Sequence, residues 1–335
     1  MLVLSDGVAG HDRASDGIVR ALGHKVPVRA HWLRMEEVRP RSRRLARLAA
    51  ASLAPAPFLS RNVRLLPDGV AAPWADASVA GWPEAAHIVV STGPSTAAAN
   101  IAAARRYGAR NIYYGFAKWP SVGFSLLLTP VAATGERMET VPRPSEVDLT
   151  DFPPPRPLAA DAPRTIAMLL GGDTKHYAYT EADFAAMAER LAGLLDTCPD
   201  WHLSVFDSRR TPQAPFAAMQ KSLAGHARVS LHPFRTGGVN SNRAAFEADA
   251  VIVTADSLSM VSECIAAGRP TMVVKTATYR GPKRDRGELA GLAAANVIAM
   301  ADVDGLDVAG LSAAPRPQRG EPARVLLDAL ARHGF

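Results

Sequence analysis

Short apolar runs alternate with alanine-rich segments along the whole chain. Apolar, β-branched runs of roughly four to eight residues predict strands, and the segments between them are long enough for crossover helices. This alternation is typical of an α/β fold with parallel sheets. The predicted strands are Leu2–Asp6, Val26–Leu33, His87–Gly93, Asn111–Phe116, Ser125–Pro130, Thr165–Gly172, His202–Ser208, Val229–Phe234, Ala250–Asp256, Thr271–Thr276 and Asn296–Ala301.

Prolines separate the first five predicted strands from the other six. They crowd the segment Glu139–Thr165, where they remove amide donors and favour extended backbone, so this segment is predicted to be a linker. A chain of 335 residues also exceeds the size that one core usually reaches. We therefore predict two Rossmann-like, doubly wound α/β domains that face a ligand cleft at the carboxyl ends of their sheets. The predicted parts are a first domain at 1–150, a proline-rich linker at 151–164, a second domain at 165–320 and a C-terminal helix at 321–335 that could cross back to the first domain.

The composition is that of an ordinary soluble globular protein, with 48% hydrophobic and 21% charged residues. Cys198 and Cys264 have no neighbouring Cys or His at metal spacing, so we expect buried thiols in a reducing compartment and no metal site.

A strand directly follows Met1 instead of a signal peptide. No apolar run reaches the roughly 18 residues of a membrane-spanning helix, and a cytoplasmic location is expected.

The positive charge is concentrated in the first half of the chain. Residues 1–150 contain 18 Lys and Arg against 12 Asp and Glu, whereas residues 151–335 contain 20 of each kind. Six arginines interleave with leucines over Arg34–Arg47, followed by the apolar, proline-containing stretch Ala54–Leu59. A basic amphipathic helix here would suit an anionic membrane surface, such as the inner membrane. The alternative is a solvated, arginine-rich face. Nucleic acid is not expected, because this stretch lacks aromatic side chains for base stacking.

Several predicted strands of the second half end in polar turns. The first turn reads Leu169-Leu170-Gly171-Gly172-Asp173-Thr174-Lys175-His176. Gly171 and Gly172 would allow a close approach of backbone to a ligand, and Lys175 would offset the charge of a phosphate. The alternative is an ordinary turn ahead of a helix, whose start is indicated by a capping box at Thr180–Asp183.

Two more turns could contact a nucleotide. Ser208, Arg209 and Arg210 follow the strand His202–Ser208, and paired arginines suit bidentate phosphate contacts. The segment His232–Asn240 could border a nucleobase, or it could be an ordinary loop.

The stretch TADSLSMVSE, residues 254–263, is the most polar strand end. A helix that starts near Ser257 would direct its free amides at a ligand. Hydroxyls of the first turn can bind phosphate, and a carboxylate one turn further can accept the two hydroxyls of a ribose. Asp256 or Ser257 as a simple N-cap is the alternative, but it does not explain Glu263. We therefore predict a nucleoside diphosphate site here, formed by Thr254, Asp256, Ser257, Ser259 and Glu263.

The same stretch carries a resemblance to a known family. IVTADSLSMVSECIAAGRPTMVV, from Ile252 onward, is similar to a strand, loop and helix of the mitochondrial fission ELM family, whose bacterial members are classed as candidate glycosyltransferases. SDGVAGH at 5–11, LLGGDTKHY at 169–177 and SRRTP at 208–212 extend the resemblance over both halves. It implies a GT-B fold, with an acceptor site in the first domain and a nucleotide-sugar site in the second.

The loop from Asp6 to His11 follows the first strand and is the candidate catalytic site. An imidazole at this position can act as general base toward an acceptor hydroxyl, with Asp6 beside it. The alternative is that His11 is only a polar turn residue. An inverting transferase would need such a base, whereas a retaining one would not.

The sequence thus favours a metal-independent glycosyltransferase that uses a nucleoside diphosphate sugar, linked to UDP or GDP, and an envelope glycan or lipid-linked acceptor. No bound cofactor is expected. The carboxylate pair in Asp302-Val303-Asp304 is interpreted as a turn, not a metal site. Two alternatives remain, a sugar-nucleotide 2-epimerase of the same fold and a non-catalytic membrane adaptor.

Overall fold

The structure is a computed structural model that describes residues 1–35, 82–116, 123–132, 134–148, 151–158, 162–174, 178–235, 241–315 and 321–335. The chain divides into two compact units. Unit 1 comprises Met1–Glu146 and Pro322–Phe335, and unit 2 comprises Val147–Glu321. Each unit is an α/β fold around a parallel six-stranded sheet, which confirms the predicted fold class.

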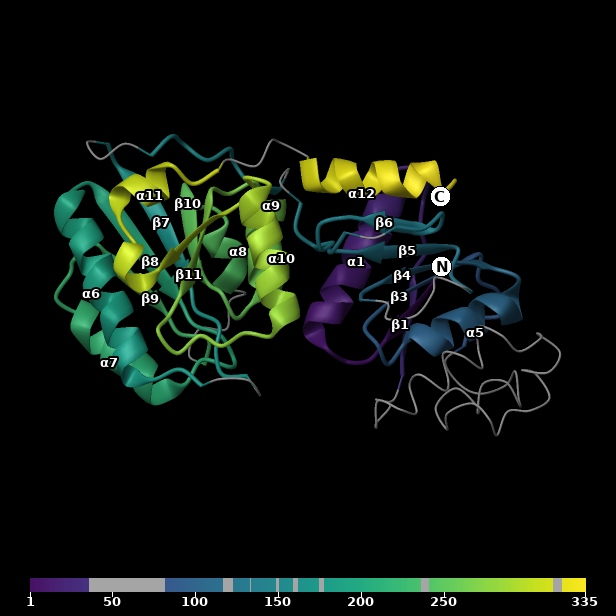
Figure 1. The fold of residues 1–335 in the computed structure, drawn as a ribbon, viewed down its shortest axis with the longest axis horizontal. Coiled ribbons are helices and arrows are strands. Elements are labelled where there is room, and N and C mark those ends of the chain that lie inside the picture. The colour runs from purple at the N-terminus through teal and green to yellow at the C-terminus, as the bar shows by residue number, and fades with distance from the viewer. Residues whose placement is uncertain are drawn as a thin grey trace. The chain divides into compact units, whose positions relative to one another are not determined.

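The sheet of unit 1 has the strand order β2-β1-β3-β4-β5-β6. Figure 1 labels all of these strands except β2. Two strands differ from the sequence prediction. β2 begins at His31 rather than at Val26, since Pro27 has no amide to donate to a neighbouring strand. β6 overlaps the start of the proline-rich segment Glu139–Thr165, where no strand was predicted, and pairs with β5. The strands are β1 Leu2–Ser5, β2 His31–Arg34, β3 Ile88–Thr92, β4 Arg110–Tyr114, β5 Leu126–Thr129 and β6 Met138–Thr140.

Among the described residues of unit 1, three helices cover this sheet: α1 Ala9–Gly23, α5 Ala97–Tyr107 and α12 Glu321–Arg332. Ile18 of α1 and Leu330 of α12 belong to one apolar cluster, whereas alanines of α5 pack in two other clusters. Arg332 donates two hydrogen bonds to the carboxylate of Glu139, at 3.1 and 2.8 Å, so the end of α12 is attached to β6. The last helix of the chain is therefore part of unit 1.

The sheet of unit 2 has the order β12-β11-β10-β7-β8-β9, and all its pairs are parallel. Strand order reverses at β7, which lies between β8 on one side and β10 on the other. The loops that follow β7 and β10 therefore lie next to each other, where ligands bind in open α/β sheets. The strands are β7 Arg164–Leu169, β8 Trp201–Phe206, β9 Val229–His232, β10 Ala250–Thr254, β11 Thr271–Lys275 and β12 Ala299–Asp302.

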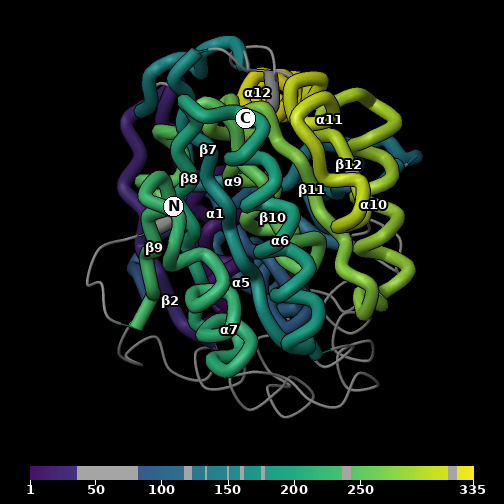
Figure 2. The backbone as a smooth tube through the Cα atoms, turned by 90° about the vertical axis from the view of Figure 1, so that its left-hand side faces the viewer, coloured from purple at the N-terminus to yellow at the C-terminus, as the bar shows by residue number. Residues whose placement is uncertain are grey.

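Helices cover both faces of this sheet. α6 Glu181–Thr197, α7 Gln213–Leu223 and α11 Val308–Ser312 pack on one face, and α8 Ser241–Ala245, α9 Leu258–Ala266 and α10 Lys283–Ala294 on the other. Figure 2 views unit 2 from the side of α6 and α7. The predicted capping box at the start of α6 is present, since Thr180 and Asp183 exchange hydrogen bonds.

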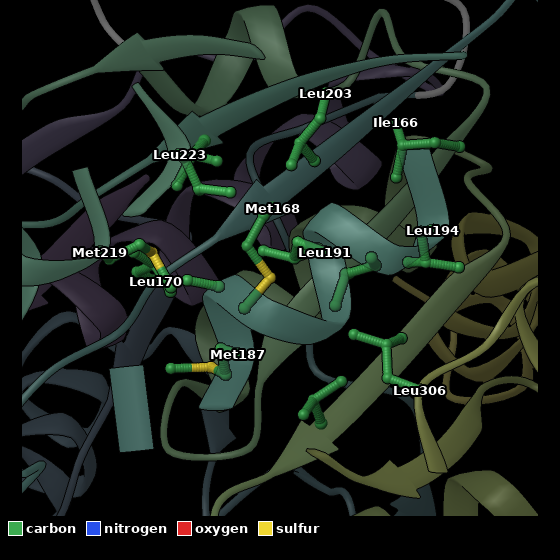
Figure 3. Packing of buried hydrophobic residues seen from close by; sticks show 14 of the residues in the cluster. Ile166, Met168, Leu170, Met187, Leu191, Leu194, Leu203, Met219, Leu223 and Leu306 are labelled. Atoms are coloured by element: carbon green, nitrogen blue, oxygen red, sulfur yellow. The ribbon is translucent and has the colours of Figure 1, made fainter. Parts of the chain in front are cut away.

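Long aliphatic side chains form a large part of the core beneath α6 (Figure 3). Met168 and Leu170, from β7 and its end, pack against Met187 and Leu191 of α6. These side chains are 0 to 1% exposed, so this end of β7 is firmly held just before its polar loop starts. Among the described helices, none combines the length and apolar character that crossing a membrane requires.

Candidate functional site

The loops that follow β7 and β10 are joined by hydrogen bonds in unit 2. The amide of Gly171 donates to Thr254 Oγ1 at 2.8 Å, and the amide of Gly172 donates to Asp256 Oδ2 at 2.8 Å. Thr254 Oγ1 in turn donates to Asp256 Oδ1 at 2.6 Å. The two loops predicted to bind a nucleotide are therefore one continuous polar structure.

Asp256 is the centre of this structure. Besides Thr254 and Gly172, its carboxylate accepts hydrogen bonds from the hydroxyl of Tyr179 at 2.7 Å and from Nη2 of Arg210 at 3.1 Å. The side chain is fully buried. Burial raises the pKa of Asp256 to about 7, while the amide of Gly172 acts in the opposite direction. All four hydrogen bonds are donated to the two oxygens, which is the pattern of an ionised carboxylate beside the Arg210 guanidinium.

Gly171 and Gly172 are required by packing within the loops. A Cβ at Gly171 would lie 2.0 Å from Asp256 Oδ2, and a Cβ at Gly172 would lie 2.1 Å from the carbonyl carbon of Arg210. The sequence analysis assigned both glycines to the approach of a ligand. In the structure they allow the close approach of Asp256 and of the turn that follows β8.

The turn after β8 holds its two arginines differently. Arg210 Nη1 donates to the carbonyls of Gly172 and Asp173, at 3.2 and 3.3 Å, in addition to the ion pair with Asp256. Burial lowers the pKa of Arg210. Arg209 is exposed. The hydroxyl of Ser208 donates to the carbonyl of Gly171 at 3.0 Å, so this turn is tied to the loop after β7 as well.

The helix α9 begins directly after Asp256. Ser257 is its N-cap residue but makes no side-chain cap hydrogen bond. Asp256 is engaged elsewhere, so neither residue serves as the side-chain cap that the alternative interpretation required. Ser259 is partly exposed in the first turn, and Glu263 is 3% exposed one turn later.

Three residues of the cluster were missed by the sequence analysis. Tyr179 reaches Asp256 from the segment before α6. Thr211 Oγ1 accepts from the amide of Ser208 at 2.8 Å and donates to the carbonyl of Gly171 at 2.5 Å. Tyr279, in the loop after β11, is buried, and burial raises its pKa to about 12. The SRRTP motif contained Thr211, but no local pattern pointed to either tyrosine.

The candidate catalytic pair lies at the reversal point of the unit 1 sheet. Nδ1 of His11, in α1, lies 3.0 Å from both carboxylate oxygens of Asp6. The Asp6 side chain is 3% exposed and that of His11 is 28% exposed. Gly93, after β3, has a φ of +97°, and a Cβ there would lie 2.4 Å from His11 Nδ1. The structure thus brings the two predicted residues together beside a turn where only glycine fits.

Arg34 approaches the same loop from the end of β2. A Cβ at Gly7, which has a φ of +74°, would lie 2.7 Å from Nη2 of Arg34. The other arginines of the predicted membrane-binding segment lie outside the described residues, as do Lys175, His176 and positions 236–240. Within the described part of the chain, no three His, Cys, Asp or Glu side chains are grouped in a way that could hold a metal ion.

The similarity to known proteins extends over both units. The sequence model of a family described as "Mitochondrial fission ELM1" matches residues 9–319. No curated protein sequence is a significant match to the chain. The structure is similar to that of MurG from Acinetobacter baumannii, with a TM-score of 0.52 at 14% identity, covering 99% of this chain and 98% of that one.

It is also similar to UDP-GlcNAc 2-epimerase from Neisseria meningitidis, a structure bound to UDP-GlcNAc, with a TM-score of 0.52 at 11% identity. That match covers 99% of this chain and 100% of the epimerase. At such identities the likeness shows the fold alone. The fold is GT-B-like, as the sequence predicted.

Proposed function

The chain belongs to the mitochondrial fission ELM1 family, and from that premise we propose that it is a metal-independent glycosyltransferase. It would transfer the sugar of a nucleoside diphosphate sugar to an envelope glycan or lipid-linked acceptor. The observation that supports this most strongly is the hydrogen-bonded polar cluster at the ends of β7, β8 and β10, centred on Asp256.

Unit 2 would hold the donor. The diphosphate would lie against the first turn of α9, where Ser257 and Ser259 offer hydroxyls and the helix offers uncapped amides. Glu263 would accept the hydroxyls of the ribose, one turn away from the charge of the phosphates. Lys175 and Arg209 would add positive charge. Negative charge develops on the diphosphate as it leaves, and amides and cations placed in advance stabilise it without a metal ion.

Unit 1 would supply the general base. A carboxylate that accepts a hydrogen bond from Nδ1–H fixes the tautomer of His11 and leaves Nε2 free to take the proton of an acceptor hydroxyl. Asp6 has this geometry, at 3.0 Å from both of its oxygens. This assignment corresponds to an inverting reaction, in which the hydroxyl attacks the anomeric carbon as the diphosphate departs.

The donor assignment is tested by thermal unfolding of the full chain with UDP, GDP, CDP, ADP and their sugars. A ligand at a concentration 100 times its dissociation constant stabilises a protein by about 2.7 kcal/mol. The nucleotide that binds should therefore raise the Tm. Glu263→Ala should abolish that rise. Glu288→Ala removes another buried glutamate, on α10, and is the control. This variant should show the same rise in Tm as the wild-type protein. If no nucleotide shifts the Tm of the folded protein, the donor site is refuted.

A sugar-nucleotide 2-epimerase is the second candidate. The epimerase from Neisseria meningitidis is as similar in fold as MurG is, with the same TM-score of 0.52, so the fold does not choose between the two chemistries. An epimerase would return the sugar with changed stereochemistry and need no acceptor, which product analysis by NMR distinguishes. A non-catalytic membrane adaptor would bind no nucleotide sugar.

A further inference from the structure

The four hydrogen bonds to Asp256 come from different parts of unit 2. Gly172 belongs to the loop after β7, Tyr179 precedes α6, Arg210 belongs to the turn after β8, and Thr254 ends β10. One buried carboxylate thus joins three neighbouring strand ends. The buried carboxylate holds these donors in place, because a donor that moved away would lose a strong, charge-assisted hydrogen bond.

The adjacent arginines differ in what holds them. The guanidinium of Arg210 has three oxygen partners, on Asp256, Gly172 and Asp173, and its side chain is 38% exposed. Arg209, next to it in the sequence, is exposed as well, but no hydrogen bond to another described residue holds its side chain. Paired residues that look equivalent in the sequence therefore have different environments.

Asp256 directly precedes α9, the helix to which the diphosphate is assigned. An uncompensated carboxylate there would repel a diphosphate. The ion pair with Arg210, at 3.1 Å, offsets this charge. Since the charge of Arg210 is balanced by Asp256, the positive charge available to a ligand from this turn is that of Arg209.

We propose that Asp256 is a positioning residue, which holds Arg210 and the backbone of Gly172 in place beside the diphosphate site, and that Arg209 is the arginine of this turn that contacts the diphosphate. The inference rests on the proposed donor site in unit 2. It divides the roles of two neighbouring arginines and gives Asp256 no direct contact with the donor.

The test compares binding of UDP, GDP, CDP and ADP with binding of their nucleosides, by isothermal titration and ligand-observed NMR. Asp256→Asn should weaken binding of the preferred diphosphate about tenfold, as expected for losing a charged hydrogen bond, and leave nucleoside binding unchanged. Asp249→Asn, a matched change at the other end of β10, should affect neither. Asp249 is also buried and accepts several hydrogen bonds.

Double-mutant cycles separate the arginines. Asp256→Asn and Arg210→Gln should be strongly non-additive for diphosphate affinity, because each removes the same ion pair. Asp256→Asn and Arg209→Gln should be additive. If Asp256→Asn fails to fold, Tyr179→Phe removes one of its donors without changing charge and should weaken diphosphate binding in the same direction.

Each part of the inference can be overturned by a specific result. Unchanged diphosphate affinity in Asp256→Asn, equal losses for diphosphate and nucleoside, or additivity with Arg210→Gln would each overturn the positioning role. Strong non-additivity with Arg209→Gln would overturn the division of the arginines. If the wild-type protein binds none of the diphosphates, the proposed function fails, and this inference fails with it.

Discussion

In each unit, a glycine at a strand end leaves room for a polar side chain beside it. Gly171 leaves room for the carboxylate of Asp256, and Gly93 leaves room for the imidazole of His11. Any larger residue at either position would collide with the side chain that the proposal assigns to positioning or catalysis. The glycines therefore set the geometry of the polar groups, whatever ligand those groups bind.

His11 provides the sharpest prediction at the residue scale. His11→Gln removes the proposed base, so release of nucleoside diphosphate from the donor chosen by the unfolding screen should slow by about 100- to 10,000-fold. Affinity for the nucleotide should not change, because the donor is assigned to unit 2. His24→Gln, at the end of the same helix, is the control and should have wild-type kinetics. Wild-type turnover in His11→Gln would refute the assignment.

At the scale of elements, Asp249 joins the segment that precedes β7 to the start of β10. Its carboxylate accepts hydrogen bonds from the amide, Nε and Nη2 of Arg156, at 3.0, 2.9 and 2.8 Å, and from the amide of Thr165 at 2.9 Å. Burial alone would raise the pKa of Asp249, but these hydrogen bonds together hold it below its ordinary value.

This predicts a specific dependence of stability on pH. A depressed pKa in the folded state contributes stability above the unfolded pKa of about 3.9, and that contribution is lost as pH falls through the folded value. Asp249→Asn should lower the free energy of unfolding by about 1–3 kcal/mol at pH 7, and the difference should shrink below about pH 4.

Urea unfolding at several pH values measures this difference. Asp304→Asn is the control, because Asp304 is 90% exposed and should change stability by less than about 0.5 kcal/mol at any pH. A deficit of Asp249→Asn that persists unchanged at low pH would contradict the account.

Strands and helices could be predicted from the sequence where the pattern lies within the residues of the element itself. Apolar runs such as Ala250–Thr254 are long enough to be read as buried strands, and the capping box at Thr180 marked the start of α6. β6 was missed because a strand of three residues, just ahead of Pro142, is too short to show an apolar pattern. Tyr179 was missed because it reaches Asp256, 77 positions away, and only the folded sheet brings them together.

At the scale of the whole molecule, the two units repeat one architectural rule. In each, the candidate residues follow the strands at which the sheet order reverses, β1 and β3 in unit 1 and β7 and β10 in unit 2. The alternation of strands and helices was sufficient to predict two such sheets. It did not predict which hydrogen bonds the polar strand ends would make with one another, because those depend on the register and order of strands far apart in the sequence.

The central claim is that the polar strand ends of unit 2 form the nucleotide-sugar site. Hydrogen–deuterium exchange of the full chain, with and without the nucleotide that raises Tm, would locate the bound nucleotide. We expect slower exchange at residues 170–174, 207–212 and 254–260, and unchanged exchange at residues 5–11 of unit 1. Protection confined to other segments, with these three unchanged, would contradict it.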